Sequence, residues 1–258
     1  MATVTHRVAE RPRDYVRLTG PDAEDFLQRM VSNDVSSGEV CEALLLTPKA
    51  RVIAPLVVVR RGAEDFLLLT EPGLGPVVQA TLARARLGAR VEIVQERHRS
   101  VVVLGGSGGI PNRDYGEPAA ELLDADVEPT LPADELERLR IEAGMPAWGK
   151  EIDDRVLPAE AGLVERAVDF AKGCYPGQEP IARLRYRGHA NRGLRRLRIE
   201  TAESPAYDAE VRHGEKVVGR VTSSARAGNA VVALAYVRVE VPADAELAVG
   251  DAAARSLH

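Results

Sequence analysis

The residues best suited to chemistry lie in one short run from Lys172 to Arg183, which reads KGCYPGQEPIAR. Within it, Cys174 lies between Lys172 and the arginines that begin at Arg183, and positive neighbours favour the thiolate form of a cysteine. A thiolate is nucleophilic, redox-active and able to bind a metal. Gly173 and Gly177 permit sharp turns or close approach to a ligand. A tight surface turn, in which the cysteine fills a small apolar gap, is the alternative that composition leaves open.

A run of arginines follows in a chain whose formal net charge is -5. Its members are Arg183, Arg185, Arg187, Arg192, Arg195 and Arg196. Guanidinium groups bind carboxylates and phosphates, so the run is either a docking strip for an anionic ligand tail or RNA, or solvated charge on a loop and an edge strand. The acidic balance and the 4% aromatic content argue against a nucleic-acid partner.

Other candidate motifs give weaker signals. The glycine-rich stretch in VVVLGGSGG, residues 101–109, follows a predicted strand but lacks the GxGxxG spacing of a dinucleotide loop. None of the five histidines is spaced from another histidine or a cysteine as metal ligands are, so we expect no metal site. The acidic pair Asp153-Asp154 is typical of a solvated turn.

Periodicity and turn signals predict the elements that must position these residues. Two apolar runs, 41–47 and 52–60, flank Pro48-Lys49-Ala50-Arg51 and predict a β-hairpin. Apolar spacing predicts a helix over 74–87, and a second helix is expected around Pro118 to Leu123. A third helix begins at Asp134 and stops at Gly144, the residue type that most readily ends one.

The second half of the chain changes character twice. From about residue 146 to 192, glycine and proline recur among charged residues, which predicts a long irregular segment of the kind that carries function. After Gly193 only short strands are predicted, and this marks a small all-β unit at the C-terminus.

Bulk properties indicate a cytoplasmic globular protein. The 258 residues suffice for one large domain or a medium one with a small one, and 45% of them are hydrophobic. The first residues contain no apolar signal segment, and no run of about 18 apolar residues predicts a membrane span. Cys41 and Cys174 lie far apart in dissimilar contexts, so we expect reduced thiols rather than a disulfide.

Several segments, in the same order, resemble the YgfZ family and its aminomethyltransferase cousins. They are RLTGPDAEDFLQRMVSNDV with its Asn33-Asp34 pair, LLLTPKARV, RIEAGMPAWGKEID, LPAEAGL, KGCYPGQEPIARLRYRG, and VGRVTSSA followed by ALAYVR. Together they span nearly the whole chain. The Lys-Gly-Cys-Tyr-x-Gly-Gln-Glu core, Lys172 to Glu179, is the most specific of them, and the others are shared more widely.

The resemblance implies an α+β fold. We expect an aminomethyltransferase-like, folate-binding body over residues 1–190, divided into two subdomains near residue 100. A C-terminal β-barrel is expected over residues 191–258.

The ligand that the resemblance implies is tetrahydrofolate or a one-carbon derivative. A pterin needs a carboxylate facing its amino and ring N–H groups, and the match of DYGEPAAEL to the aminomethyltransferases assigns this role to Glu121. Glu117 is the alternative, because the local match is loose. Asn33, Tyr175 and Arg187 are further candidates for folate contacts, and the arginine run is a source of cations for the glutamyl tail.

One departure from the aminomethyltransferase pattern bears on activity. Those enzymes carry an Asp-Asp pair in the strand after the hairpin, where this chain has Ala54-Pro55. Neither side chain can donate or accept a proton. The resemblance therefore favours an accessory factor for iron–sulfur cluster assembly or repair, with a folate-dependent one-carbon transferase or demethylase as the alternative.

The motif residues then receive roles. Cys174 is the reactive or cluster-contacting thiol, Lys172 and Arg183 tune it, and Gln178 and Glu179 orient the motif through hydrogen bonds. The expected partners are folate and iron–sulfur client or assembly proteins, and we expect a monomer with no membrane partner.

Overall fold

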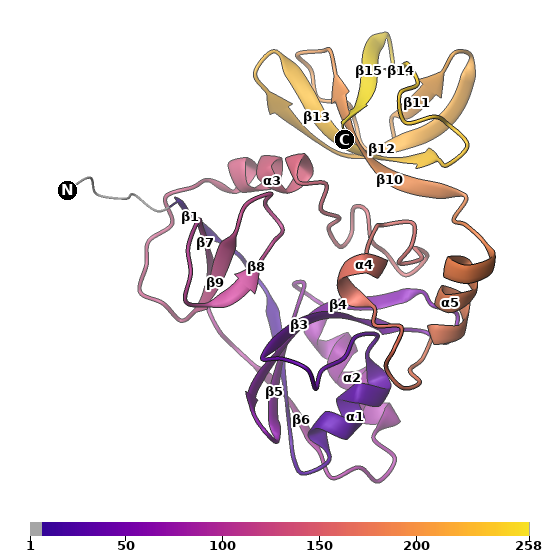
Figure 1. The fold of residues 1–258 in the computed structure, drawn as a ribbon. Coiled ribbons are helices and arrows are strands. Elements are labelled where there is room, and N and C mark those ends of the chain that lie inside the picture. Colours follow the sequence, from indigo (N-terminus) through magenta and orange to yellow (C-terminus); the bar gives the residue numbers. More distant parts are fainter. Residues whose placement is uncertain (1–6, 258) are drawn as a thin grey trace.

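The structure, a computed structural model, describes residues 7–257, which form three β-sheets and five helices (Figure 1). The barrel lies at one end of the molecule and the five-stranded sheet at the other, with the four-stranded sheet beside them. Within this part of the chain, no helix is long and apolar enough to cross a membrane.

The five-stranded sheet has the order β3-β4-β5-β2-β6 and is antiparallel at each pairing. Its strands are β2 (Asp14–Thr19), β3 (Val40–Leu46), β4 (Val52–Gly62), β5 (Asp65–Thr70) and β6 (Glu92–Glu96). Helices α1 (Ala23–Met30) and α2 (Gly75–Ala85) supply apolar side chains to the core on one face of this sheet. The predicted hairpin is β3–β4, and Leu44 and Pro55, which are paired across it, line a cavity.

The four-stranded sheet has the order β1-β7-β9-β8, so the first strand of the chain joins strands from well beyond it. Its strands are β1 (Arg7–Glu10), β7 (Ser100–Leu104), β8 (Ile110–Asn112) and β9 (Ala119–Leu123). The prediction of a helix around Pro118 to Leu123 is wrong, because this segment is β9. Alanine, glutamate and leucine favour helices, but pairing on both sides with β7 and β8 and burial of Ala119 to Glu121 override that preference.

The C-terminal strands close into a barrel that runs from Arg192 to Leu257, in the order β10-β13-β12-β11-β14-β15. Its strands are β10 (Arg192–Ile199), β11 (Glu210–His213), β12 (Lys216–Ala227), β13 (Ala230–Arg238), β14 (Leu247–Val249) and β15 (Ala252–Leu257). Helix α3 (Ala133–Glu142) packs on β12 and β13 through Ile141, which is buried with Val232 and Leu234. The helix ends at Glu142, and Gly144, the predicted stop, follows the cap with a φ of 77°.

The segment predicted to be irregular contains two helices, α4 (Val164–Ala167) and α5 (Gln178–Arg187). The prediction is therefore wrong for α5, which places the arginines at 183, 185 and 187 on a helix. Its proline, Pro180, lies in the first helical turn, where a missing N–H costs no hydrogen bond, so the proline does not interrupt the helix.

Candidate functional site

A cavity of about 290 Å³ lies where the two open sheets, α3 and the segment after it meet. Apolar walls come from Leu44 and Pro55 of the hairpin and from Trp148, the only tryptophan of the chain. Tyr115 adds a buried aromatic ring, and burial raises the pKa of its phenol to about 12, so it stays protonated at neutral pH. This part of the wall is therefore apolar and offers aromatic surface to a planar ligand.

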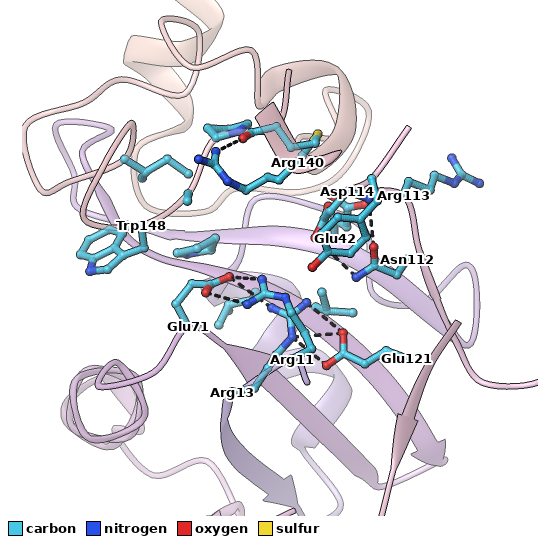
Figure 2. Close-up of a pocket in the computed structure, with 18 of the residues that line it drawn as sticks. Arg11, Arg13, Glu42, Glu71, Asn112, Arg113, Asp114, Glu121, Arg140 and Trp148 are labelled. Carbon is cyan, nitrogen blue, oxygen red and sulfur yellow. Dashed lines mark hydrogen bonds and ion pairs between the residues drawn. The ribbon is translucent and has the colours of Figure 1, made fainter. Parts of the chain in front are cut away.

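Two arginines that precede β2 cross the floor of this cavity (Figure 2). The guanidinium of Arg13 holds Glu121 at 2.8 to 3.1 Å, and their side chains are only 5% and 1% exposed. Arg11 holds both oxygens of Glu71 at 2.6 and 3.1 Å, and Arg13 also reaches Glu71 at 3.3 Å. Burial by itself would raise the pKa of Glu71, but the charges of Arg11 and Arg13 lower it by more. The pKa therefore lies below its usual value, and this carboxylate is ionised.

The register of the strands brings these charges together. In the antiparallel β2–β5 pair, Asp14 lies opposite Thr70. Arg13, which precedes Asp14, is therefore a neighbour of Glu71, which follows Thr70. Glu121 enters from β9, and its Oε1 also accepts the Ser100 hydroxyl at 2.7 Å. Both oxygens of Glu121 are thus engaged within the described part of the chain.

Two further ion clusters contribute residues to the upper wall. Arg166 of α4 binds Glu42 of β3 at 2.6 and 2.7 Å and Asp114 at 3.0 Å. Arg140 of α3 holds Glu137 at 2.7 and 2.8 Å, and Lys150 also contacts that carboxylate at 2.6 Å. Among residues 7–257, each carboxylate that lines the cavity has a cationic partner; these carboxylates are Glu10, Glu42, Glu71, Asp114, Glu121 and Glu137. In this part of the chain, every acid that lines the cavity is therefore already in contact with a cation.

The positions where the related enzymes carry two acids point to opposite faces of β4. Pro55 lines the cavity, whereas Ala54 is buried in the core under α1 and α2. Proline lacks an N–H, and β4 tolerates it because the pairing of β4 with β5 begins only at Val57. The carbonyl of Pro55 accepts the Thr70 hydroxyl at 2.8 Å. The cavity-facing position thus carries no proton-transfer group.

The cysteine motif lies outside the lining of the cavity. Cys174 is exposed and has a free thiol, whereas Lys172, two residues earlier, turns inward. The ammonium of Lys172 donates to the carbonyls of Val31 at 2.8 Å and Asn33 at 2.5 Å. Burial lowers the pKa of Lys172 to about 8, with Asp34 acting against the shift. The lysine therefore clamps the cysteine loop onto the segment after α1.

The other half of the motif packs under the β3–β4 turn. Gly177 has a φ of 85°, and a Cβ there would meet the Thr47 carbonyl at 2.8 Å and the Ala50 Cα at 3.0 Å. Tyr175 is buried in the core shared by the hairpin and α5, and its hydroxyl has no hydrogen-bond partner in the described chain. Burial raises the pKa of Tyr175 to about 12. The glycine and the tyrosine thus fix where the cysteine loop ends and α5 begins.

Helix α5 carries four more of the predicted residues. Glu179 and Arg183 form an exposed pair at 3.9 Å, and Gln178 lies in the first turn, where its N–H bonds the Tyr175 carbonyl at 3.3 Å. Arg187 is exposed at the end of the helix. None of these side chains lines the cavity.

Asn33 connects the cavity wall to the motif, although it does not line the cavity itself. Its amide Nδ2 donates to the Glu42 carbonyl at 2.7 Å and to the Arg166 carbonyl at 3.4 Å. Its own carbonyl accepts the Lys172 ammonium. Glu42 lines the cavity and is ion-paired with Arg166, so Asn33 alone separates that pair from the motif lysine.

Of the two glutamates considered for the pterin, Glu121 lines the cavity, and Glu117 lies outside the lining in an ion pair with Arg7. Sequence reasoning missed Arg11, Arg13 and Arg113. Arg11 and Arg13 could have been noticed as two arginines just before a buried strand. Their carboxylate partners could not be named from the sequence, because the register of the strands decides which residues become neighbours. Arg113 is an exposed rim residue with no ion pair among the described residues, and Figure 2 shows it directed away from the paired charges.

Comparison with known proteins places this geometry in context. No family model matches the chain. The tRNA-modifying protein YgfZ of Edwardsiella ictaluri is 27% identical, over 94% of this chain and 87% of that protein. The aminomethyltransferase of Bacillus cytotoxicus is 23% identical, over 90% and 80% of the two chains. The crystal structure of the glycine cleavage system aminomethyltransferase T from Bartonella henselae superposes with a TM-score of 0.80 at 20% identity, covering 97% of this chain and 84% of that one.

The chain is therefore related in sequence to YgfZ and aminomethyltransferase proteins, which confirms the resemblance seen in the motifs. Its fold is aminomethyltransferase-like, and the predicted α+β body with a small C-terminal barrel is confirmed.

Proposed function

We propose that the central cavity binds tetrahydrofolate or a one-carbon derivative, and that the protein assists iron–sulfur cluster assembly or repair through Cys174. The relationship to YgfZ and aminomethyltransferase proteins supports a folate ligand, and the paired charges on the cavity wall are the observation that carries the proposal. A pterin presents both donors and acceptors on one edge. An ion pair such as Arg13–Glu121 places a donor and an acceptor side by side on the cavity floor.

The cavity fits one end of this ligand. Its volume of about 290 Å³ lies at the lower end of the range for small-molecule sites, which suits a bicyclic ring more than a whole folate. Trp148 and Tyr115 provide aromatic surface for the ring. The rest of the molecule would extend past the rim, where the free guanidinium of Arg113 can bind a glutamyl carboxylate.

The same geometry favours an accessory factor over the alternative, a one-carbon transferase or demethylase. Proton transfer needs a side chain that can gain or lose a proton beside the ligand. Here the lining carboxylates are ion-paired, and Pro55 occupies the cavity-facing position of β4. The groups present can bind and orient a folate. Release of formaldehyde or methylene-tetrahydrofolate from a methylated substrate would favour the enzyme instead.

Calorimetric titration of the purified protein with tetrahydrofolate under anaerobic conditions tests the ligand. We expect saturable binding that Arg113→Ala weakens by about fivefold, the value of one exposed charge contact. Arg97→Ala removes an exposed arginine outside the cavity lining and should leave the affinity unchanged. Absence of binding at millimolar ligand would remove folate from the proposal.

Complementation of a deletion strain tests the thiol. Cys174→Ser should fail to restore the activities of iron–sulfur enzymes, whereas Cys41→Ser should restore them, because Cys41 lies on the core side of β3. Calorimetry on both variants separates folate binding from the cysteine's role. Full restoration by Cys174→Ser, at normal protein levels, would show that the thiol is not required.

A further inference from the structure

A cleft of about 650 Å³ lies between the barrel and the segment that follows α3. The segment 147–153 separates it from the folate cavity, since Trp148 and Ile152 line the cavity and Lys150 and Asp153 line the cleft. The barrel side is formed by β12 and β13. Its position between two structural units and its volume are typical of small-molecule sites.

The cleft collects positive charge in an acidic protein. Its cations come from both sides and are Lys150, Arg155, Arg192, Arg220 and Arg238. Three carboxylates also line it, but Glu151 is closed off: one oxygen accepts the Ser223 hydroxyl at 2.6 Å, and the other accepts Arg140 at 3.0 Å and the Ala147 N–H at 2.9 Å. The lining of the cleft thus holds five cations and, besides Glu151, the carboxylates of Asp153 and Asp208, in a chain of net charge -5.

Each of these cations is paired with a carboxylate, which a phosphate would have to displace. The pairs are Lys150–Glu137, Arg155–Asp153, Arg192–Glu160, Arg238–Glu240, and Arg220 with Asp208 and Glu210. Arg155 donates to Asp153 at 2.6 and 3.0 Å, but its side chain is 83% exposed. Arg220 lies 3.7 Å from both of its carboxylates, beyond hydrogen-bond distance. Exposed pairs of this kind contribute little free energy, so a doubly charged ligand can replace them.

Aromatic surface lies beside the charge. Tyr236 forms part of the floor, its hydroxyl donates to the Glu151 carbonyl at 2.7 Å, and the Arg192 guanidinium lies 4.5 Å from its ring centroid. Tyr207 also lines the cleft and is 66% exposed. Contact of its apolar ring with water is unfavourable, so a ligand that covers the ring gains free energy. An exposed tyrosine and a stacked guanidinium are both surfaces on which nucleobases stack.

We propose that this cleft binds a nucleotide, with its phosphates on Arg155 and Arg220 and its base on Tyr207. The shared chemistry is a phosphate next to an aromatic base, which a free nucleoside phosphate or an exposed nucleotide of an RNA supplies. The expectation of no nucleic-acid partner rested on averages over the whole chain, and such averages do not describe a local cleft. The inference is independent of folate binding, because Arg155, Arg220 and Tyr207 do not line the folate cavity.

Titration calorimetry on the full-length protein tests the proposal with four probes: ATP, AMP, pyrophosphate and a short single-stranded RNA. We expect saturable binding of ATP or of the RNA, weakened about tenfold or more by Arg155→Glu combined with Arg220→Glu. Tyr207→Ala should weaken binding of the nucleotide probes and leave pyrophosphate binding unchanged. The matched control is Arg226→Glu combined with Arg255→Glu, two exposed barrel arginines outside the cleft lining, which should change nothing.

The pattern across the probes identifies the source of the ligand. Binding of ATP and AMP assigns the cleft to a free nucleotide, and binding of the RNA with a steep salt dependence but not of the mononucleotides assigns it to RNA. The proposal is overturned if no probe binds at millimolar concentration, or if the charge-reversed protein binds as tightly as the wild type. Urea unfolding of each variant, followed by circular dichroism, checks that the barrel and the body remain folded.

Discussion

Removal of the Glu121 carboxylate should destabilise the protein strongly, because it leaves the guanidinium of Arg13 buried without its main partner. Arg13 is only 5% exposed, and the nearest remaining carboxylate is that of Glu71 at 3.3 Å. Breaking a buried pair from one side costs about 3–5 kcal/mol. The residual contact to Glu71 puts Glu121→Ala near the lower value, about 3 kcal/mol.

Urea unfolding followed by circular dichroism measures this cost. With an m-value near 3 kcal/mol/M, typical of a chain this long, the midpoint of Glu121→Ala should fall by about 1 M. The double variant Arg13→Met with Glu121→Leu replaces both charges by apolar groups and should recover most of the loss. A double variant as unstable as the single one, or a loss below about 1 kcal/mol for Glu121→Ala, would refute the assignment of a buried, coupled pair. Folate affinity should be compared only where each variant is fully folded.

Three further predictions concern the cysteine motif. Gly177→Ala should lower the free energy of unfolding in urea by about 2 kcal/mol or more, because an alanine there combines a positive φ with a contact of 2.8 Å to a carbonyl. Gly173→Ala has open space around it and should cost little, so equal costs for the two variants would contradict the packing. As the pH rises from 8 to 10, the free energy of unfolding of the wild type should increase by roughly 1–2 kcal/mol relative to that of Lys172→Met, because the Lys172 pKa of about 8 lies below its unfolded value and the unfolded chain binds more protons in this range. A difference that does not change with pH would exclude a buried ammonium. Native protein should react with a thiol reagent first at the exposed Cys174, and slowly at Cys41, whose pKa burial raises to about 11; faster loss of Cys41 would contradict this placement.

Local signals in the sequence were sufficient to predict part of this fold. The turn residues between the apolar runs predicted the β3–β4 hairpin, and the change to short strands after Gly193 predicted the barrel, whose first strand starts at Arg192. Both depend on patterns within a few residues. The strand β9 was missed because its own residues favour a helix, and only pairing with β7 and β8 makes it a strand.

The candidate site was harder to predict, because its contacts join residues that are distant in sequence. Glu121 was found through the resemblance, but its partner Arg13 could be assigned only once the sheets were known. Lys172 was expected to tune Cys174, and its inward turn to the Asn33 carbonyl has no local signature. The expected role of Lys172 stays a prediction, and the structure adds a clamp that the same side chain provides.

The packing of Gly177 under the β3–β4 turn has a consequence for the order of folding. The two contacting segments are separated by most of the N-terminal body, so the contact closes late and depends on the hairpin being formed first. During synthesis the cysteine loop emerges after its support is in place. In the finished protein, opening of the hairpin releases the loop as well, so amide hydrogens at the start of α5 should exchange with solvent no more slowly than those of the hairpin turn.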